Sequence, residues 1–528
     1  MSPVEQFSPL AEAHQLLSQR NYREAHRVCR SAIERDPGLA DAYYVMGIIA
    51  YEHQDIVRAQ KLFEKALENG HPEAGPRVQL ARCLALQGQA EQALAHIRDG
   101  LALGSEDRFT LSSAAAVLSQ LDRHEDALDV HRAAAKLAPN DALIQFNLAS
   151  ALQFTGQFEA AREVYRRCLE IAPQFVPPRF HLAMISKHTP EENDLAALQE
   201  IWDKRHPQDV EGGLQAAHAL AKINEDLGHQ DVAMDWLDRG KALFRQRVPS
   251  RRSQDAASYS ASAALARSIS LSGEALPNGP IFIAGLPRTG TTLTDRILSS
   301  HSGIVSAGER SEFAAGLHRQ AGLGTRDILD AGIIDRAGQI DLAPVGRTYL
   351  DQLSALTGTD KRFTDKMPIN AFYVPAILKA IPNARVICLR RHPADSVLSI
   401  YRQFFAVSAV FYRYAYDLED LAYHVSDYLD LLDVYDQHLP ASRFRIVDYE
   451  DLVDQPEATI RDILSFSGLE FEPECLDFQN NAAPVATASV VQVRQPIFKS
   501  SKGRWERYRS QLQPALTVLE QKGRLDPN

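Results

Sequence analysis

Small side chains recur at a fixed interval along the first third of the chain. Alanine returns every 34 residues, and a second column of small residues runs twelve positions ahead of the first. The two helices of a hairpin approach closely only where their side chains are small, so paired columns predict stacked helical hairpins with large apolar residues between them. The first column is Ala25, Ala59, Ala93, Ala127 and Ala161, and the second is Ala13, Gly47, Ala81, Ala115 and Ala149.

Two further columns mark where these helices end. Pro37, Pro139 and Pro173 stand at the boundary between repeats, and Gly88 and Gly156 share the turn between paired helices. The pattern resembles the tetratricopeptide repeat (TPR), which implies an array that binds peptides or partner proteins. A scaffold for dimerisation or for packing against the same chain is the equal alternative, because the sequence does not choose between binding faces.

The periodicity also predicts the domain organisation. About five regular repeats extend to residue 175 and diverged repeats follow, so we expect a helical array over residues 6–245. The stretch 246–274 is rich in Ser, Ala and Arg, and we expect a connector that is partly helical and mobile. The pattern then changes, and an α/β domain is expected over residues 275–528.

A strand, a glycine-containing loop and a helix follow one another near residue 280. The run Ile281–Ala284 is apolar and β-prone, the loop extends from Gly285 to Gly290, and a helix is expected from about Thr291. Backbone N–H groups and the positive end of the helix dipole then form an anion cradle. The alternative is a strand–turn–helix junction that needs glycine only for its backbone shape.

This loop differs from the loop of a nucleoside triphosphatase at its main cation. The spacing G-x-x-x-x-G matches a Walker A loop, yet Thr291 stands where that loop has lysine. Arg288, inside the loop, is the replacement cation. We therefore expect phosphate binding by this loop without ordinary ATPase or GTPase activity.

A second strand–loop–helix unit lies within residues 384–403. Ala384–Leu389 has the pattern of a strand and Pro393 suits a first helical turn, so Arg391 and Ser399 could face one anion. Two anion sites on one sheet indicate a nucleotide that is phosphorylated at both ends. The alternative is a surface arginine and a helix-facing serine. A basic cluster over residues 492–508 also suits a polyanion pocket in a chain of net charge −11.

The composition narrows the class of protein. The 528 residues are 45% hydrophobic and 24% charged, which is typical of a globular chain and excludes a disordered or collagen-like one. The net charge of −11 disfavours a general nucleic-acid surface. Five cysteines without a pairing pattern, no signal peptide and no membrane-length apolar run predict reduced thiols in a cytoplasmic protein.

Residues 279–510 resemble the sulfotransferase family, which takes sulfate from 3′-phosphoadenosine-5′-phosphosulfate (PAPS) and releases adenosine 3′,5′-bisphosphate (PAP). The loop GLPRTGTT carries the resemblance together with Arg391 and Ser399, which match the 3′-phosphate motif. Within the family the likeness is greatest to the tyrosylprotein sulfotransferases and their bacterial TPR-fused relatives. It implies an N-terminal TPR α-solenoid followed by a P-loop-like α/β domain with a central parallel sheet.

The resemblance also implies the residues of the site. Glu309 is the expected catalytic base, and His301 is the rival for that role. Arg288, Lys366 and Ser489 are expected to stabilise the transition state, and Asp365 is expected to order Lys366. The residues expected to bind the nucleotide are Pro287, Arg288, Thr289, Gly290, Thr291, Thr292, Arg391, Ser399, Tyr449 and Arg504, and the charge of the basic cluster adds Lys502.

The chemistry of this reaction can be anticipated from its charges. Sulfuryl transfer to a hydroxyl is an in-line displacement, so positioning and charge stabilisation carry most of the work. Because side chains supply the cations, we expect no metal to be required. The acceptor is a peptide or protein tyrosine, a glycan or a small metabolite, and the TPR array binds it, another partner or a second subunit in a homodimer. The alternative is a TPR adaptor whose C-terminal domain senses nucleotide without catalysis.

Overall fold

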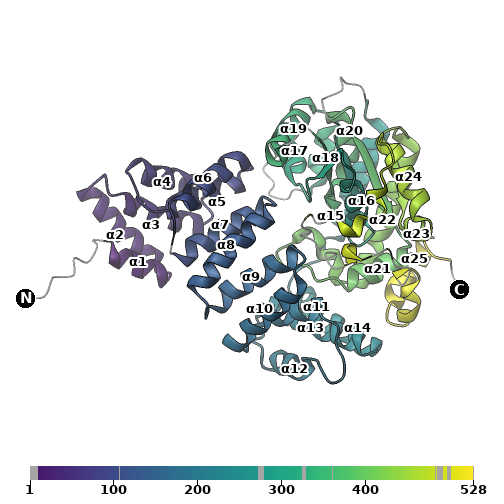
Figure 1. Cartoon of the computed structure of the whole chain (residues 1–528). Coiled ribbons are helices and arrows are strands. Elements are labelled where there is room, and N and C mark those ends of the chain that lie inside the picture. The colour runs from purple at the N-terminus through teal and green to yellow at the C-terminus, as the bar shows by residue number, and fades with distance from the viewer. Residues whose placement is uncertain are drawn as a thin grey trace, which may run out of the picture. The chain divides into compact units, whose positions relative to one another are not determined.

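The computed structural model divides the chain into two compact units, Met1–Thr155 and Gly156–Asn528 (Figure 1). The division falls inside the helical array expected over residues 6–245, because the later helices of that array pack into the second unit. The described residues are 10–105, 107–271, 279–323, 329–358, 361–481, 483, 492–495, 497 and 501–526.

The first unit is a succession of helices joined by short turns. Members of the two small-residue columns that fall in this unit are buried, and the alanines among them are completely so. The repeat that the sequence predicts is therefore the packing pattern of the helices. The helices are α1 (Ala11–Ser18), α2 (Tyr22–Arg35), α3 (Ala40–Glu52), α4 (Ile56–Glu68), α5 (Gly75–Leu86), α6 (Ala90–Ala102), α7 (Arg108–Gln120), α8 (His124–Leu137) and α9 (Ala142–Phe154).

The second unit begins with helices that continue the hairpin pattern. Helices α13 and α14 form a closely packed pair, and Ala217 and Gly240 meet where they cross. Phe180, on α11, packs against Phe404 of the following α/β region, so these helices share a core with it. The helices are α10 (Phe158–Ile171), α11 (Val176–Ile185), α12 (Leu195–Lys204), α13 (Val210–Asp226) and α14 (Gln230–Arg245).

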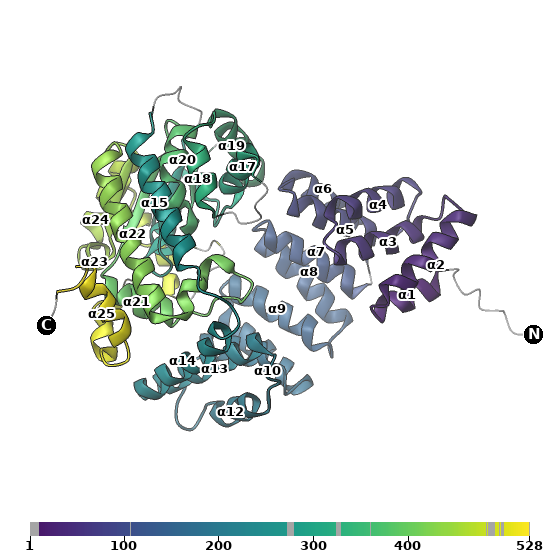
Figure 2. The same cartoon turned by 180° about the vertical axis from the view of Figure 1, so that it is seen from behind.

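Helix α15 (Arg252–Ser268) occupies most of the connector expected to be partly helical and mobile: the helix is present, but its close packing corrects the expectation of a mobile segment. It packs against α22 (Leu418–His438) and α18 (Ala331–Ala337), as the view from behind also shows (Figure 2). The buried hydroxyl of Ser262 donates to the carbonyl oxygen of Phe372 at 2.6 Å and shares a 2.6 Å hydrogen bond with Tyr435. The Ser- and Ala-rich composition is thus the small-residue surface of a helix that lies close to its neighbours.

The α/β region is built on a parallel sheet, as expected from the sequence. The described strands lie in the order β2-β3-β1-β4-β5, and each neighbouring pair is parallel. All five residues of β1 are buried, which is typical of a parallel strand covered on both faces. The strands are β1 (Ile281–Gly285), β2 (Ile304–Ser306), β3 (Arg362–Asp365), β4 (Arg385–Arg390) and β5 (Phe444–Asp448).

Helices cover both faces of this sheet. Alternate residues of β1 enter two separate cores: Ile281 and Ile283 pack with helices of one face, and Phe282 and Ala284 with helices of the other. The first face carries α16 (Thr291–Ser299), α23 (Tyr449–Asp454) and α24 (Pro456–Ser467). The second carries α15, α18 and α22 with α17 (Glu312–Ala321), α19 (Ala343–Thr357), α20 (Val374–Ala380), α21 (Pro393–Tyr401) and α25 (Gln513–Gln521).

The cysteines serve as small apolar side chains in these cores. All five are free thiols and all five are buried. Burial raises the pKa of the Cys388 thiol to about 12, so this group stays protonated near neutral pH. In the described part of the chain, no helix combines the length and the apolar composition that crossing a membrane requires.

Substituting Gly47 by leucine should destabilise the first unit by about 1–3 kcal/mol. A Cβ atom at Gly47 would lie 2.5 Å from Cε1 of Phe63, so α3 and α4 would have to separate. Thermal unfolding followed by circular dichroism measures the loss. Because Phe63 is the neighbour that clashes, Phe63→Ala should cost less in the Gly47→Leu background than in the wild type. Additive effects of the two substitutions would contradict this packing.

Candidate active site

The loop after β1 has a backbone that only certain residues tolerate. Gly290 adopts φ +103°, and a Cβ atom there would lie 2.8 Å from Cδ2 of Tyr449. Arg288 also has a positive φ, +67°, which is uncommon for a residue with a side chain. The Thr289 hydroxyl donates to the carbonyl oxygen of Leu286 at 2.7 Å and closes the turn. These contacts hold the loop against the ring of Tyr449, which follows β5.

Helix α16 begins immediately after this loop, so its N-terminus points towards the site. Asp295, one turn into the helix, accepts hydrogen bonds from the hydroxyls of Thr364 at 2.5 Å and Ser306 at 2.9 Å. Thr364 lies on β3 and Ser306 on β2. The carboxylate therefore fixes the helix to two strands and keeps the position of the loop constant.

Arg391, which follows β4, joins the loop to the C-terminal segment. Its Nη1 donates to the carbonyl oxygen of Arg288 at 2.9 Å, and its Nη2 donates to that of Ser501 at 2.6 Å. The guanidinium lies 4.7 Å from the ring centre of Tyr449, whose hydroxyl shares a 2.8 Å hydrogen bond with Ser501. The Nε–H of Arg391 is buried and has no hydrogen-bond partner among the described residues.

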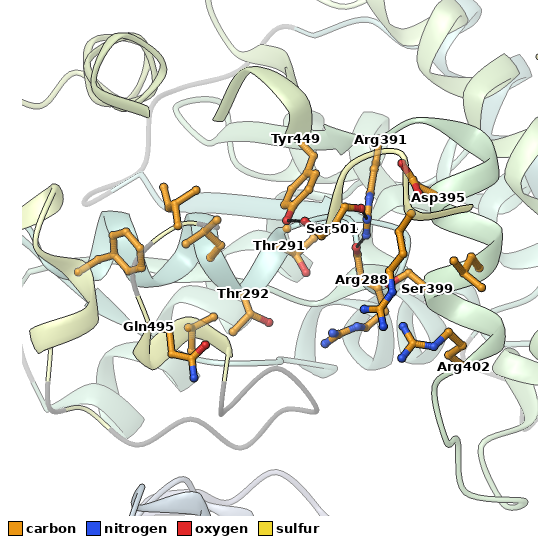
Figure 3. Close-up of a pocket in the computed structure, with 17 residues that line it drawn as sticks. Arg288, Thr291, Thr292, Arg391, Asp395, Ser399, Arg402, Tyr449, Gln495 and Ser501 are labelled. Carbon is orange, nitrogen blue, oxygen red and sulfur yellow. Dashed lines mark hydrogen bonds between the residues drawn. The ribbon is translucent and has the colours of Figure 1, made fainter. Parts of the chain in front are cut away.

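These groups surround one pocket rich in cations and hydroxyls. Figure 3 shows the side chains of Arg288, Ser399 and Arg402 turned towards one another within it. Burial, together with Arg391 and Arg402, lowers the pKa of Arg288 to about 10, so the guanidinium remains charged at neutral pH. The pocket is lined by Arg288, Gly290, Thr291, Thr292, Leu293, Arg391, Asp395, Leu398, Ser399, Arg402, Tyr449, Phe478, Val493, Gln495, Ile497, Ser501 and Arg504.

Asp395 is an acidic residue of this pocket, and two backbone N–H groups donate hydrogen bonds to its carboxylate. Its Oδ2 accepts from the N–H of Gly503 at 2.7 Å and its Oδ1 from the N–H of Trp505 at 3.0 Å. The carboxylate therefore caps the C-terminal segment, and the arginine side chains dominate the potential inside the pocket.

Most of the residues expected to bind a nucleotide meet here, and three do not line this pocket. Thr289 is turned into its own loop, as described above. Lys502 forms an ion pair with Asp454 at an exposed position, and Pro287 lines a different cavity. The expected residues that do line the pocket are Arg288, Gly290, Thr291, Thr292, Arg391, Ser399, Tyr449 and Arg504.

The second cavity is small, and half of its lining residues carry aromatic rings. It adjoins the beginning of the loop, where Pro287 forms part of its wall, and Pro368 brings the segment after β3 to its edge. Burial, with the charge of Glu309 as a smaller contribution, raises the pKa of Tyr412 in its wall, so the carboxylate is close enough to influence this ring. Its aromatic lining residues are Tyr259, Phe372, Phe411, Tyr412, Tyr414, His424 and Tyr428.

Glu309 and Lys366 form an ion pair beside the loop. Lys366 Nζ donates to Glu309 Oε1 at 2.5 Å, and the backbone N–H of Lys366 donates to the carbonyl oxygen of Gly308 at 2.8 Å. The Lys366 side chain is 3% exposed, whereas that of Glu309 is 42% exposed. The carboxylate of Glu309 is thus accessible from solvent, and the buried Lys366 binds it from the protein interior. Ser489, expected to act with them, lies outside the described residues.

Asp365 fixes the turn that carries Lys366. Its carboxylate accepts from the hydroxyl of Tyr349 at 2.7 Å, from the amide of Asn370 at 3.2 Å and from the backbone N–H of Met367 at 3.1 Å. Burial raises the pKa of Asp365 to about 7. This arrangement fits the ordering role that the sequence suggested for Asp365.

His301 lies in the turn between α16 and β2, with one ring nitrogen hydrogen-bonded inside that turn and the other to the segment after α24. Its Nε2 donates to the carbonyl oxygen of Glu470 at 3.1 Å, and its Nδ1 accepts from the N–H of Gly303 at 3.0 Å. His301 does not line either of the two cavities described above. Its contacts are those of a capping residue.

Comparison with known proteins identifies the family of the α/β region. Residues 280–473, which contain the whole described sheet, match the Sulfotransferase family, and residues 107–174 match the tetratricopeptide repeat. Residues 280–473 form a sulfotransferase domain. The helical region before it contains tetratricopeptide repeats.

Three relatives illustrate these likenesses. An uncharacterized protein of Aquifex aeolicus (strain VF5) is 30% identical over 61% of this chain, which spans only 41% of that relative. A candidate protein-tyrosine sulfotransferase of Caenorhabditis briggsae is 25% identical over 37% of this chain and 68% of the relative. The sulfotransferase domain of the Synechococcus PCC 7002 olefin synthase is 18% identical, with a TM-score of 0.35, over 49% of this chain and 99% of that domain.

Sequence reasoning missed one residue that lines this pocket, Arg402, and one that contacts its arginines, Glu225. Arg402 lies three positions after Ser399 at the end of α21, and this helical spacing is a signal that could have identified it. Glu225, on α13, contacts Arg402 and Arg504. No sequence pattern indicates this contact, because Glu225 and Arg402 are 177 positions apart.

Substitution Asp365→Asn should remove part of the pH dependence of the stability of the sulfotransferase domain. The carboxyl has a pKa of about 7 in the folded chain, against about 3.9 in an unfolded one. The folded state therefore holds this proton more tightly, and the resulting stabilisation, complete below about pH 4, is lost as the pH rises through 7.

Thermal unfolding between about pH 5 and pH 8.5 measures this effect. The wild type should lose more stability over this range than Asp365→Asn, which cannot ionise. The exposed residue Asp351, on α19, provides the control Asp351→Asn, which should keep the wild-type slope. Parallel curves for wild type and Asp365→Asn would contradict the assignment of the buried proton to Asp365.

Proposed function

We propose that the chain transfers the sulfuryl group of PAPS to a hydroxyl acceptor, with Glu309 as the base. The observation that carries the proposal is the order in which charged and polar side chains lie along the carboxyl edge of the sheet. Following the strand order, Glu309 comes after β2, Lys366 after β3, the loop with Arg288 after β1, Arg391 after β4 and Tyr449 after β5. Ligands of open parallel sheets bind at this edge.

The described residues fit a nucleotide that carries an anion at each end. The loop and the N-terminus of α16 offer backbone donors for the 5′-phosphosulfate, and Arg391 and Ser399 line the same pocket for the 3′-phosphate. The buried Nε–H of Arg391 lacks a protein partner, which is costly unless a ligand accepts from it. The glycine at 290 lets the loop pack directly against the ring of Tyr449, which lines the same pocket.

PAPS, when bound, supplies the sulfuryl group, and the chain's own residues handle charge and the proton. The accessible carboxylate of Glu309 accepts the proton of the attacking hydroxyl, so the nucleophile gains charge as it attacks. Lys366 and Arg288 donate towards the bridging oxygen, where negative charge grows as the S–O bond breaks. Sidechain cations therefore provide the stabilisation, and no metal ion is needed in this proposal.

The aromatic cavity beside the loop supports an aromatic acceptor. The cavity that these side chains enclose is only about 20 Å³, so a phenol ring would enter after Phe372, Tyr412 or Tyr414 had moved aside, and it would then pack against them. A tyrosine of a peptide or protein has this chemistry, and the likeness to the Caenorhabditis briggsae relative agrees with it. We propose that the tetratricopeptide repeats recruit the protein that carries the acceptor. Glycans and small metabolites are the alternative acceptors to be tested.

The first test is nucleotide binding in the presence of EDTA. The full chain should bind PAP without Mg²⁺, and Arg391→Ala should weaken binding by roughly 100-fold, because charge-assisted hydrogen bonds to the phosphate are lost. Isothermal titration calorimetry measures both affinities. Arg461→Ala, an exposed arginine of α24, is the matched control and should bind as the wild type does. Tight binding of Mg-ATP with no binding of PAP would exclude the proposal.

The second test separates catalysis from binding. Glu309→Gln should reduce turnover by about 10²–10⁴-fold because the base is lost, while the dissociation constant for PAP changes by less than about threefold. Transfer of labelled sulfate to a panel of phenols, tyrosine peptides and glycans measures turnover. Glu474→Gln, at an exposed position, serves as the control. Nucleotide binding without transfer to any acceptor, in the wild type, would favour the non-catalytic adaptor instead.

A further inference from the structure

A carboxylate from the helices that precede the sulfotransferase domain reaches the wall of its pocket. Glu225 lies near the end of α13, and its side chain is 13% exposed. Its Oε1 accepts from Arg504 Nη2 at 2.5 Å and from the hydroxyl of Tyr508 at 2.5 Å, and its Oε2 accepts from Arg402 Nη2. Both arginines line the proposed nucleotide pocket.

The charges explain why this contact holds the two arginines in place. Burial alone would raise the pKa of Glu225, but Arg402 and Arg504 outweigh it and keep the pKa below its ordinary value. The carboxylate is therefore ionised at neutral pH. It offsets the repulsion between the guanidinium groups of Arg402 and Arg504, which lie close to each other, and Arg402 also lies close to Arg288.

The geometry leaves most of each guanidinium available to a ligand. Arg402 and Arg504 each donate to Glu225 through Nη2 only. Because a guanidinium has five N–H donors, the remaining N–H groups of each arginine are available to a ligand. Arg402 follows Ser399 by one helical turn, and both line the pocket with Arg391. The anchored arginines thus border the part of the pocket assigned above to the 3′-phosphate.

We propose that Glu225 is a positioning residue of the nucleotide site, which orients Arg402 and Arg504 towards the 3′-phosphate of the bound nucleotide. This inference rests on the proposed function. Helix α13 is then part of the nucleotide site. A sulfotransferase domain expressed from residue 275 onward would lack Glu225, and with it the carboxylate that orients Arg402 and Arg504. Nucleotide binding and the docking of α13 would then stabilise each other.

The neighbouring carboxylate provides a matched control. Asp226 lies on the same helix and is similarly buried, with a side chain 9% exposed. Its partners are Lys222, Lys187 at 3.0 Å and the backbone N–H of His188 at 3.1 Å, and it does not line the pocket. Substitutions Glu225→Gln and Asp226→Asn therefore remove equivalent charges, but only the first acts on the pocket arginines.

The experiment compares two nucleotides with the full chain by isothermal titration calorimetry. PAP carries a 3′-phosphate and adenosine 5′-monophosphate does not. Glu225→Gln should weaken PAP binding roughly tenfold or more and leave the binding of the monophosphate within about threefold, because only the 3′-phosphate contacts are lost. Asp226→Asn should change neither affinity by more than about threefold.

Each other outcome overturns the inference. An equal loss of affinity for both nucleotides in Glu225→Gln would indicate a general structural role. Unchanged or tighter binding of PAP would mean that the carboxylate is irrelevant to the nucleotide or competes with it. Failure of the wild type itself to bind PAP would instead remove the proposed function, so the two failures are distinguishable.

Discussion

Several arginine side chains converge at one edge of a parallel sheet, and their mutual repulsion is the constraint on which the site depends. Arg288, Arg391, Arg402 and Arg504 line the same pocket. Like charges in a partly buried space are costly unless anions or hydrogen-bond acceptors offset them. The fold offsets them from outside the sheet: Arg391 donates to backbone carbonyl groups, and Arg402 and Arg504 donate to the carboxylate of Glu225.

This requirement explains why the second unit extends back into the repeat-like helices. If α10 to α14 were an appended module, no charged group from them would need to enter the pocket wall. Instead, Glu225 supplies a carboxylate to the pocket, and the buried Lys241 of α14 donates to the carbonyl oxygen of Ala415 at 2.8 Å. Polar groups buried in this way fix how two elements pack, because any displacement would leave a charge without a partner.

Local patterns in the sequence predicted the parts of the fold and site that depend on local chemistry. The alanine columns identified the buried faces of the repeat helices, because close packing is set by residue size, and the glycine spacing with the cation Arg288 identified the loop. Contacts between distant segments carry no such signal. Composition therefore misassigned α15 as a mobile connector, and charge alone placed Lys502 in the pocket, whereas it pairs with Asp454.

The ion pair of Glu309 and Lys366 bears on whether the domain is an enzyme or a nucleotide sensor. Burying a lysine with only 3% of its side chain exposed is costly, and the half-exposed carboxylate of Glu309 and the nearby buried Asp295 offset this cost. Nucleotide binding at the arginine pocket would not require this cost, since Lys366 does not line that pocket. A reaction in which charge grows beside the loop would require it, because a desolvated cation stabilises such charge more strongly than a hydrated one. The burial of Lys366 therefore agrees with the catalytic role that we propose for it.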